Sequence, residues 1–367
     1  MGGLVVGTAS DRRGLPESAF FGRWPGTDRC VVVSHRRGWE GFGSYSLGGE
    51  LARERPLLAI ERRLTELSSD RSSLSSGSRA ELDDLRAEWA RCARETYTDL
   101  EPWEAVVVAR HPNRPSILDF IRHAVDDFCE LHGDRYFGDD SAIVAGFGHV
   151  GDHRVMLIGH NRGREAAERA ACRFGCARPE GYRKALAKMQ LAAKFGVPIV
   201  TLIDTPGAYP GAESEERGIA RAIAANLSAM PRLRVPIVAV VTGEGGSGGA
   251  LGIGVADRLA MFEHSVYSVI SPEGCASILF RTGTMAREAA ASLKLLASDL
   301  REMGLVDEIL PEPLGGAHRN HAETAQTWRA FVIRTVNELI GLGADQLIAR
   351  RHERLRFVDS SRVSPIP

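Results

Sequence analysis

The sequence predicts an α/β protein whose central sheet is largely parallel. Short apolar runs rich in β-branched residues, such as VPIVTLID (197–204) and VPIVAVVT (235–242), have the unbroken hydrophobicity of strands buried on both faces. Segments with helical spacing of apolar residues lie between these runs, and strands that alternate with helices form parallel sheets covered by helices. We therefore expect loops at the carboxyl edge of this sheet to offer a place for a ligand.

The length and composition fit a globular protein with a buried core. The chain has 367 residues, of which 44% are hydrophobic and 25% are charged, which is enough for one large or two ordinary domains. It carries 46 Lys and Arg residues against 47 Asp and Glu residues, so we expect neither a nucleic acid nor a membrane as a partner. The apolar runs are far shorter than the ~18 residues that a membrane-spanning helix needs. The first residues lack the features of a signal peptide, and we expect a cytoplasmic protein.

The six cysteines are scattered without the spacing of a disulfide framework, which is typical of a reducing compartment. Cys172 and Cys176 have the spacing of metal ligands. No second pair of Cys or His residues stands nearby to complete four ligands, so we expect no metal site on this chain.

The chain divides into four regions. Residues 1–56 contain many glycines and no sustained period of helix or strand, and we interpret them as a poorly ordered extension. Residues 57–100 predict a helical hairpin, because two segments with an apolar helical face flank a serine-rich linker at 68–78. Residues 101–320 predict the α/β core, and residues 321–367 predict C-terminal helices and a tail.

Within the core, apolar and β-branched runs predict strands at 142–148, 154–160, 197–204, 235–242 and 258–263. Helical patterns predict helices at 181–195, 215–230, directly after Gly249, and from 322 to about 354. The stretch GEGGSGGALG (243–252) therefore stands where a strand ends and a helix begins.

This glycine stretch fits motifs of different chemistry. A G-x-S-x-G pattern surrounds Ser247, as in the nucleophile turn of serine hydrolases. The downstream acids and histidines available to such a serine are Asp257, Asp307, His264, His318 and His321. A G-x-G-x-x-G pattern runs from Gly243 to Gly248, with Glu263 at the place of the ribose-binding acid of a dinucleotide site.

A third interpretation uses only the backbone. Consecutive glycines at the start of a helix leave peptide N–H groups uncovered by side chains and unpaired within the helix, and the helix dipole adds partial positive charge. Such a turn binds an oxyanion. A tight turn that permits close helix–strand packing is the structural alternative.

Two further loops carry turn and capping residues. DTPGAYPG (204–211) follows the strand before the glycine strand, and the two loops are expected to form the walls of one cleft. SPEGCAS (271–277) opens a helix with Pro and Glu in its first turn.

A series of sequence words runs from about Arg110 to Asn320: LDF, GDR, GHNRGRE, FG, PEGYRKAL, IDTPGAYPG, EERG, GEGGSGGALGIG, YSVISPEGCASIL and EPLGGAHRN. In these words and their order the chain resembles the alpha subunit of the bacterial acetyl-CoA carboxylase carboxyltransferase. The resemblance implies an α/β fold with a crotonase-like (ClpP/crotonase) spiral ββα core, to which the helical hairpin and the C-terminal helices are added.

The resemblance also implies a function that needs other chains. In that family the subunit pairs with a beta subunit of the same fold in an α2β2 heterotetramer, with the active site between them. The complex moves the carboxyl group of carboxybiotin, held on the biotin carboxyl carrier protein that biotin carboxylase serves, to acetyl-CoA to give malonyl-CoA. Its zinc belongs to the beta subunit. This chain alone is then expected to have little or no activity, and a non-catalytic structural or regulatory role is the alternative.

Site residues follow from the same resemblance. The backbone amides of Gly248 and Gly249 are expected to hold the ureido oxygen of biotin, on which negative charge develops, and Ser247 is then a turn residue. The other residues expected to bind substrate are Gly245, Gly246, Gly207, Tyr209, Pro210, Gly274, His160, Arg162 and Arg164.

Basic residues near these loops have two interpretations. His160, Arg162 and Arg164 fit contacts with anionic groups of a ligand, and a structural ion pair is the alternative. Arg162 stands where the family has lysine, and a planar fork of donors differs from a point charge. One helix face is expected to be solvated surface, with attraction of CoA phosphates as the alternative: Arg183, Lys184 and Lys188.

Overall fold

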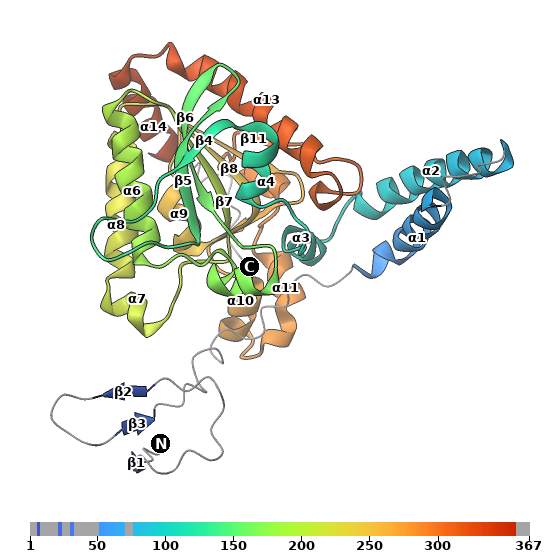
Figure 1. Cartoon of the computed structure of the whole chain (residues 1–367), viewed down its shortest axis with the longest axis horizontal. Helices are drawn as coiled ribbons and strands as arrows, with labels where there is room; N and C mark the ends of the chain where they lie inside the picture. The colour runs from blue at the N-terminus through green and yellow to red at the C-terminus, as the bar shows by residue number, and fades with distance from the viewer. Residues whose placement is uncertain (1–5, 8–20, 24–29, 33–50, 70–75, 357–367) are drawn as a thin grey trace. The chain divides into compact units, whose positions relative to one another are not determined.

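The structure of the chain is a computed structural model that describes residues 6–7, 21–23, 30–32, 51–69 and 76–356 (Figure 1). The chain divides into two compact units, residues 1–45 and 46–367. In the first unit the described segments are three short strands paired antiparallel in the order β1-β3-β2, namely β1 (Val6–Gly7), β2 (Phe21–Arg23) and β3 (Cys30–Val32). The rest of the predicted extension lies mostly outside the described residues.

The second unit is built on an eight-stranded sheet with the order β11-β9-β8-β7-β6-β5-β4, and β10 pairs with β8 beside this path. Its strands are β4 (Asp126–Glu130), β5 (Ile143–Val150), β6 (His153–His160), β7 (Ile199–Thr205), β8 (Ile237–Gly246), β9 (Arg258–Phe262), β10 (Val266–Ser268) and β11 (Glu308–Leu310). All pairs from β6 to β11 are parallel, whereas β4, β5 and β6 pair antiparallel. The predicted parallel sheet is confirmed, with an antiparallel edge in addition.

Helices cover both faces of this sheet (Figure 1). The helices of the described residues are α1 (Arg55–Ser69), α2 (Ser76–Tyr97), α3 (Pro102–Ala109), α4 (Ile117–Ala124), α5 (Ala166–Ala171), α6 (Pro179–Lys194), α7 (Ala212–Glu216), α8 (Ile219–Ala229), α9 (Ser247–Gly254), α10 (Pro272–Leu279), α11 (Ala286–Ser292), α12 (Ala297–Glu302), α13 (His321–Ile340) and α14 (Ala344–Arg356), of which α1 and α2 project away from the sheet. Among the helices of the described residues, none combines the length and apolar character needed to cross a membrane.

Two apolar cores lie on the two faces of the sheet. Along β8, Ile237 and Ala239 belong to the core under α6, α8 and α9, and Val238 and Val240 belong to the core under α4, α13 and α14. This alternation follows from the period of two along a strand. Because both faces are covered, every residue of β7 and β8 is buried, which explains their unbroken apolar sequences.

The helices at both ends of the second unit differ in detail from the prediction. Packed structure begins before residue 57, since Leu51 is buried and α1 begins at Arg55. The helical region predicted from 322 to about 354 consists of two helices, because α13 ends at Ile340 and α14 begins at Ala344. Glycine is a poor helix former, and Gly341 and Gly343 stand in the break.

A fully buried arginine holds α14 against the amino end of the sheet. Arg351 donates two hydrogen bonds to Asp257, at 2.9 and 2.6 Å, and others to the carbonyls of Met230, Leu233 and Val235 at 2.8 to 3.0 Å. The carboxylate of Asp257 also accepts from the amide of Ile237. The buried charges of Arg351 and Asp257 thus compensate each other.

We expect Arg351→Ala to lower the free energy of unfolding by about 3–5 kcal/mol, because the buried carboxylate and the carbonyls lose their donors. Denaturant unfolding followed by circular dichroism measures this. Arg350→Ala removes an exposed neighbour and is expected to change stability by less than ~0.5 kcal/mol. A loss below ~1 kcal/mol for Arg351→Ala would contradict the expectation.

Candidate functional site

The glycine stretch lies at the carboxyl end of β8 and opens α9. β8 ends at Gly246 and α9 begins at Ser247. The first amides of a helix have no partner within the helix, and in α9 these belong to Ser247, Gly248 and Gly249. Ser247 is exposed, Gly248 is partly exposed and Gly249 is buried. The opening turn of α9 therefore reaches the surface at the edge of the sheet where α/β proteins bind ligands.

The loop after β7 packs directly on this turn. A Cβ atom added at Gly246 would overlap the carbonyl of Pro206, and one added at Gly249 would lie 2.6 Å from the amide nitrogen of Ala208. The two loops thus touch backbone to backbone at these points. The expectation that they form opposite walls of one cleft is wrong here, because no space separates them at either glycine.

Two of the remaining three glycines also serve packing. An added Cβ at Gly243 would lie 2.8 Å from the carboxyl carbon of Asp204, and one at Gly245 would lie 2.8 Å from an aromatic ring. At Gly248 the nearest atom is Cδ1 of Ile223, at 3.8 Å. Close packing therefore accounts for four of the five glycines, and Gly248 is the one beside open space.

A small hollow lies beside residues 243–249, which we call the glycine turn. Gly245 and Gly246 line it together with apolar side chains of α3, β10 and the start of α10. This places two of the expected substrate-binding glycines next to an apolar space.

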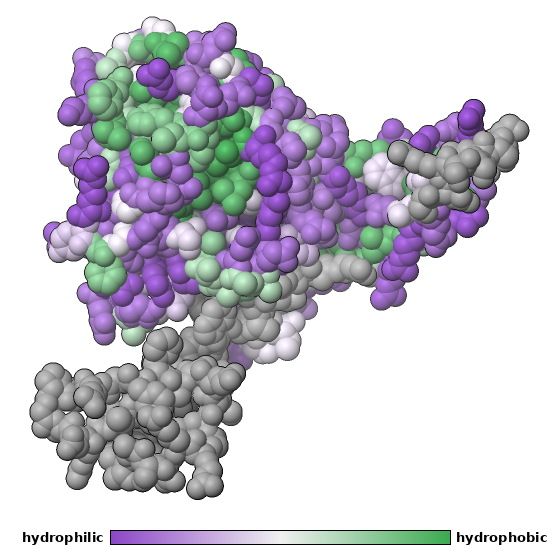
Figure 2. All heavy atoms as spheres, viewed as in Figure 1, coloured by the Kyte–Doolittle hydropathy of each residue, from purple (hydrophilic) through white to green (hydrophobic). Residues whose placement is uncertain are grey.

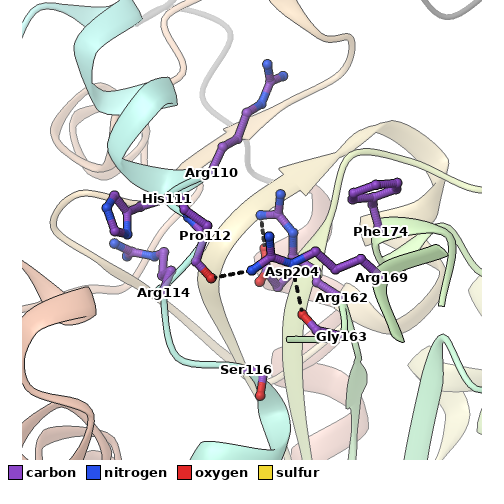
Figure 3. Close-up of a pocket in the computed structure, with 10 residues that line it drawn as sticks. All are labelled: Arg110, His111, Pro112, Arg114, Ser116, Arg162, Gly163, Arg169, Phe174 and Asp204. Atoms are coloured by element: carbon purple, nitrogen blue, oxygen red, sulfur yellow. Dashed lines mark hydrogen bonds and ion pairs between the residues drawn. The ribbon is translucent and has the colours of Figure 1, made fainter. Parts of the chain in front are cut away.

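A second small pocket lies at the carboxyl ends of β6 and β7, and we call it the arginine cavity. Figure 3 shows the side chains of Arg162 and Arg169 next to Asp204 in this cavity. Arg162 Nη1 donates to Asp204 Oδ1 at 3.1 Å, and Arg169 Nη2 donates to the carbonyl of Pro112 at 2.7 Å. The other lining residues are Arg110, His111, Arg114, Ser116, Gly163 and Phe174.

Burial and neighbouring charges shift the pKa values of three groups in the arginine cavity. Burial raises the pKa of Asp204, although Arg162 opposes this shift. Burial lowers the pKa of Arg162, but the charges of Asp204 and Glu244 and the hydrogen bond to Asp204 together outweigh it and leave that pKa above its ordinary value. Burial lowers the pKa of Arg169, and the charge of Arg162 lowers it further. The guanidinium groups of Arg162 and Arg169 thus lie close enough to repel each other, and the charge of Glu165 near Arg169 offsets this only in part, which favours a bound anion.

His160 lies behind the site rather than in it. Its side chain is buried, with 1% of the residue exposed, and burial lowers its pKa to about 3, so the ring is neutral. It lies against the backbone of Leu202 and Gly249, and its Nδ1 accepts from the amide of Asp204 at 3.4 Å. This contradicts the expectation that His160 meets anionic groups of a ligand.

The other expected residues lie around the same sheet edge. Arg164 forms an ion pair with Asp119. Tyr209 is half-buried under the guanidinium groups of Arg173 and Arg178, and Pro210 beside it is exposed. Gly207 has open space at its α-carbon, and the amide of Gly274 donates to the capping hydroxyl of Ser271 at 3.1 Å. Of all the residues expected to bind substrate, Arg162 alone lines the arginine cavity.

The basic helix face is not solvated, and that prediction is wrong. Lys184 is 1% exposed and donates to Asp139 at 2.5 Å, and Lys188 is 6% exposed and donates to the carbonyl of Gly133 at 3.2 Å. Arg183 pairs with acidic residues as well. These groups hold α6 to the preceding loop and leave no basic face for phosphates.

The structure does not provide a catalytic triad for Ser247. Its φ of +50° resembles the strained serine turn of hydrolases. The candidate acids and histidines bond to other groups: Asp257 to Arg351, Asp307 to Arg354, His264 to Glu312, His318 to Tyr97 and His321 to Asn113. Across the described residues, no cluster of three or more His, Cys, Asp or Glu side chains is arranged to hold a metal ion either.

A buried ion network under the glycine turn was not predicted. Arg110 donates to Glu244 through Nε at 2.9 Å and through Nη2 at 2.7 Å, and to Glu273 through Nη1 at 2.5 Å. The available signal was Glu244 itself, the only charged residue in a stretch of seven that otherwise holds glycines and Ser247.

Residues 50–359 match the family described as acetyl co-enzyme A carboxylase carboxyltransferase-like. The chain belongs to this family. A relative from Rhodopirellula baltica, named acetyl-coenzyme A carboxylase carboxyl transferase subunit alpha, is 48% identical over 307 residues, 82% of this chain and 96% of the relative. A relative of the same name from Prochlorococcus marinus is 51% identical over 306 residues, 83% of this chain and 92% of the relative.

Solved structures confirm the fold of this carboxyltransferase family. The transcarboxylase 12S core, with methylmalonyl-coenzyme A bound, is 21% identical with a TM-score of 0.50, over 61% of this chain and 42% of that one. A Pseudomonas malonate decarboxylase hetero-tetramer in complex with coenzyme A is 17% identical with a TM-score of 0.50, over 62% of this chain and 93% of that one. The expected crotonase-like core is therefore confirmed, and the dinucleotide-binding interpretation is wrong.

Two alanine substitutions test which glycines of the turn are required by close packing. Gly249→Ala places a methyl group against the backbone of Ala208 and is expected to lower the free energy of unfolding by about 1–3 kcal/mol. Gly248→Ala meets only a side chain at contact distance and is expected to change it by less than ~1 kcal/mol. Equal losses in denaturant unfolding would contradict this arrangement of the turn.

Proposed function

We propose that this chain is the alpha subunit of the carboxyltransferase of an acetyl-CoA carboxylase. It transfers the carboxyl group of carboxybiotin to acetyl-CoA and gives malonyl-CoA, the first committed step of fatty acid synthesis. The family match over residues 50–359 carries the proposal, because it includes the glycine turn, the arginine cavity and α10. The relatives named as this subunit match 82% and 83% of this chain, and 96% and 92% of their own length.

The amides of Gly248 and Gly249 are the proposed donors for the ureido oxygen of biotin. Both belong to the unpaired first turn of α9, where the helix dipole favours negative charge. The room at Gly248 supports the proposal, because the nearest atom to an added Cβ is a methyl group of Ile223 at 3.8 Å, which is ordinary contact distance. Gly245 and Gly246 shape the neighbouring apolar cavity. A single preorganised donor of this kind contributes on the order of 10²- to 10³-fold in rate.

The arginine cavity is the proposed place for an anionic group of the substrates. Arg162 pairs with Asp204, and the charge of Arg162 disfavours the charge of Arg169, so a bound carboxylate would stabilise both guanidinium groups. Arginine binds carboxylates through two parallel hydrogen bonds, which lysine cannot do. The remaining proposed substrate contacts are Gly207, Tyr209, Pro210, Gly274 and Arg164.

The proposed partners are a beta subunit, in an α2β2 heterotetramer, the biotin carboxyl carrier protein and biotin carboxylase, with zinc on the beta subunit. Exposed apolar residues around α10 support a subunit contact: Val269 is 77% exposed, Ile278 71% and Leu279 64%. Figure 2 shows further hydrophobic residues gathered over the middle of the core, where Figure 1 draws β4 to β6. Thioester activation would then use donors of the beta subunit.

We place this reaction in the cytoplasm. The five cysteines that the structure describes, Cys92, Cys129, Cys172, Cys176 and Cys275, are free thiols, which fits a reducing compartment.

Mixing the purified chain with its beta subunit tests the proposal. We expect malonyl-CoA decarboxylation in the presence of biocytin, a soluble biotin derivative, only when both chains are present. An equal rate with the beta subunit alone would show a non-catalytic role for this chain.

Ser247→Ala is expected to retain at least about half of this activity, because the amides and not the hydroxyl hold the oxygen. The same coupled assay measures the rate. Loss of activity together with a trappable acyl-serine in the unmodified chain would favour the hydrolase instead.

Arg162→Gln is expected to lower kcat/KM for malonyl-CoA about tenfold or more, and Arg162→Lys by less than Arg162→Gln, because lysine keeps the charge but loses the two parallel donors. Arg154→Gln, on the opposite end of β6 and exposed, is the matched control and should change little. Equal values for Arg162→Gln and Arg154→Gln would remove Arg162 from the site.

A further inference from the structure

The glycine turn has almost no side chains by which it can be held. Residues 243–249 read GEGGSGG, so only Glu244 and Ser247 carry a side chain beyond hydrogen. Ser247 is exposed, whereas Glu244 is 4% exposed. Among the side chains of the turn, Glu244 is therefore the one that can fix it from within.

Glu244 is held on two sides. Its carboxylate accepts two hydrogen bonds from Arg110, at 2.9 and 2.7 Å, which fix both the distance and the plane of the pair. Its backbone amide donates to Asp204 at 3.0 Å, and Asp204 in turn pairs with Arg162 in the arginine cavity. The turn is thereby tied to the end of β7 and to the end of α3.

Arg110 binds a second acid that belongs to another element. Glu273, in the first turn of α10, accepts from Arg110 at 2.5 and 3.3 Å. Glu244 and Glu273 stand 134 and 163 residues from Arg110 in the sequence, so one guanidinium group joins three distant segments. Figure 3 shows its side chain pointing away from Arg162 and Arg169.

This arginine stays charged. Burial lowers the pKa of Arg110, but the charges and hydrogen bonds of Glu244 and Glu273 outweigh it and raise the pKa above its ordinary value. Removing the guanidinium group would leave two carboxylates in a buried place without a partner, so the turn and α10 would have to move apart or take up water.

We propose that Arg110 is a positioning residue for carboxyl transfer: by binding Glu244 and Glu273 together, it fixes the glycine turn against α10 and so sets the direction of the Gly248 and Gly249 amides. The inference rests on the proposed function, because it concerns the same two amides. A lysine at this position keeps the charge but cannot bind one carboxylate with two parallel donors while it holds another.

Arg110→Lys, assembled with the beta subunit, is expected to lower kcat for malonyl-CoA decarboxylation about 10- to 100-fold and to leave KM for malonyl-CoA within about threefold, because misplaced donors cost rate rather than substrate binding. Glu244→Gln keeps the Arg110–Glu273 pair and is also expected to lower kcat while KM stays almost unchanged. This variant replaces Arg110→Lys in the test if Arg110→Lys fails to fold. The double variant should lose no more than the larger single loss.

Arg351→Lys is the matched control. It weakens a buried arginine–carboxylate pair of the same geometry, at 2.9 and 2.6 Å from Asp257, at the amino end of the sheet. It should lower the melting temperature as much as Arg110→Lys does, yet keep kcat within about twofold. Equal losses of kcat in the two variants, or a rise of KM with kcat unchanged, would overturn the inference.

Gly248→Val distinguishes this inference from the proposed function. It is expected to lower the rate at least ~10²-fold, because the branched side chain covers the donors. If Gly248→Val is inactive while Arg110→Lys keeps a normal kcat, only the positioning role fails. If Gly248→Val keeps a normal rate, the assignment of the amides fails, and the role of Arg110 fails with it.

Discussion

The loop after β7 and the turn after β8 meet backbone to backbone, and the rest of the site depends on that contact. The carbonyl of Pro206 occupies the place where a side chain at Gly246 would be, and the amide of Ala208 lies where one at Gly249 would be. Glycine is required at both positions because the loops leave no room for a Cβ atom. At Gly249 the same requirement removes a side chain from the first turn of α9. Close packing and the proposed anion-binding turn are therefore compatible rather than alternatives.

A turn without side chains needs another source of rigidity, and buried ion pairs supply it. Arg110 joins Glu244 to Glu273, and Arg114 joins Glu312 to the carbonyl of Thr242 at the end of the same strand. Such pairs add little net stability, because the desolvation of the charges offsets most of their attraction. They do fix geometry, since two parallel hydrogen bonds allow one orientation of the partners. The charges collected at the carboxyl edge of this sheet thus hold backbone groups in place, and Arg162 and Arg169 place two neighbouring guanidinium groups beside them.

The features that depend on local pattern could be predicted from the sequence. The apolar runs of β7 and β8 predicted the central strands. The glycines that follow β8 predicted where α9 begins. Features that depend on distant partners could not be predicted. Lys184 looks like a surface residue on its helix until the loop that holds Asp139 is packed against it. Arg110 and Glu244 lie 134 residues apart, and no local period relates them. The burial of His160 under Gly249 likewise follows only from the packed sheet.

The central claim is that peptide amides, held by buried charges, bind the oxygen that gains negative charge. A high-resolution crystal structure of this chain with its beta subunit and a bound biotin derivative tests it most directly. The claim predicts the ureido oxygen within about 2.7–3.1 Å of the amide nitrogens of Gly248 and Gly249, with Glu244 still paired to Arg110. An oxygen more than ~4 Å from both nitrogens, or amides already bonded to carbonyls of the protein, would contradict it.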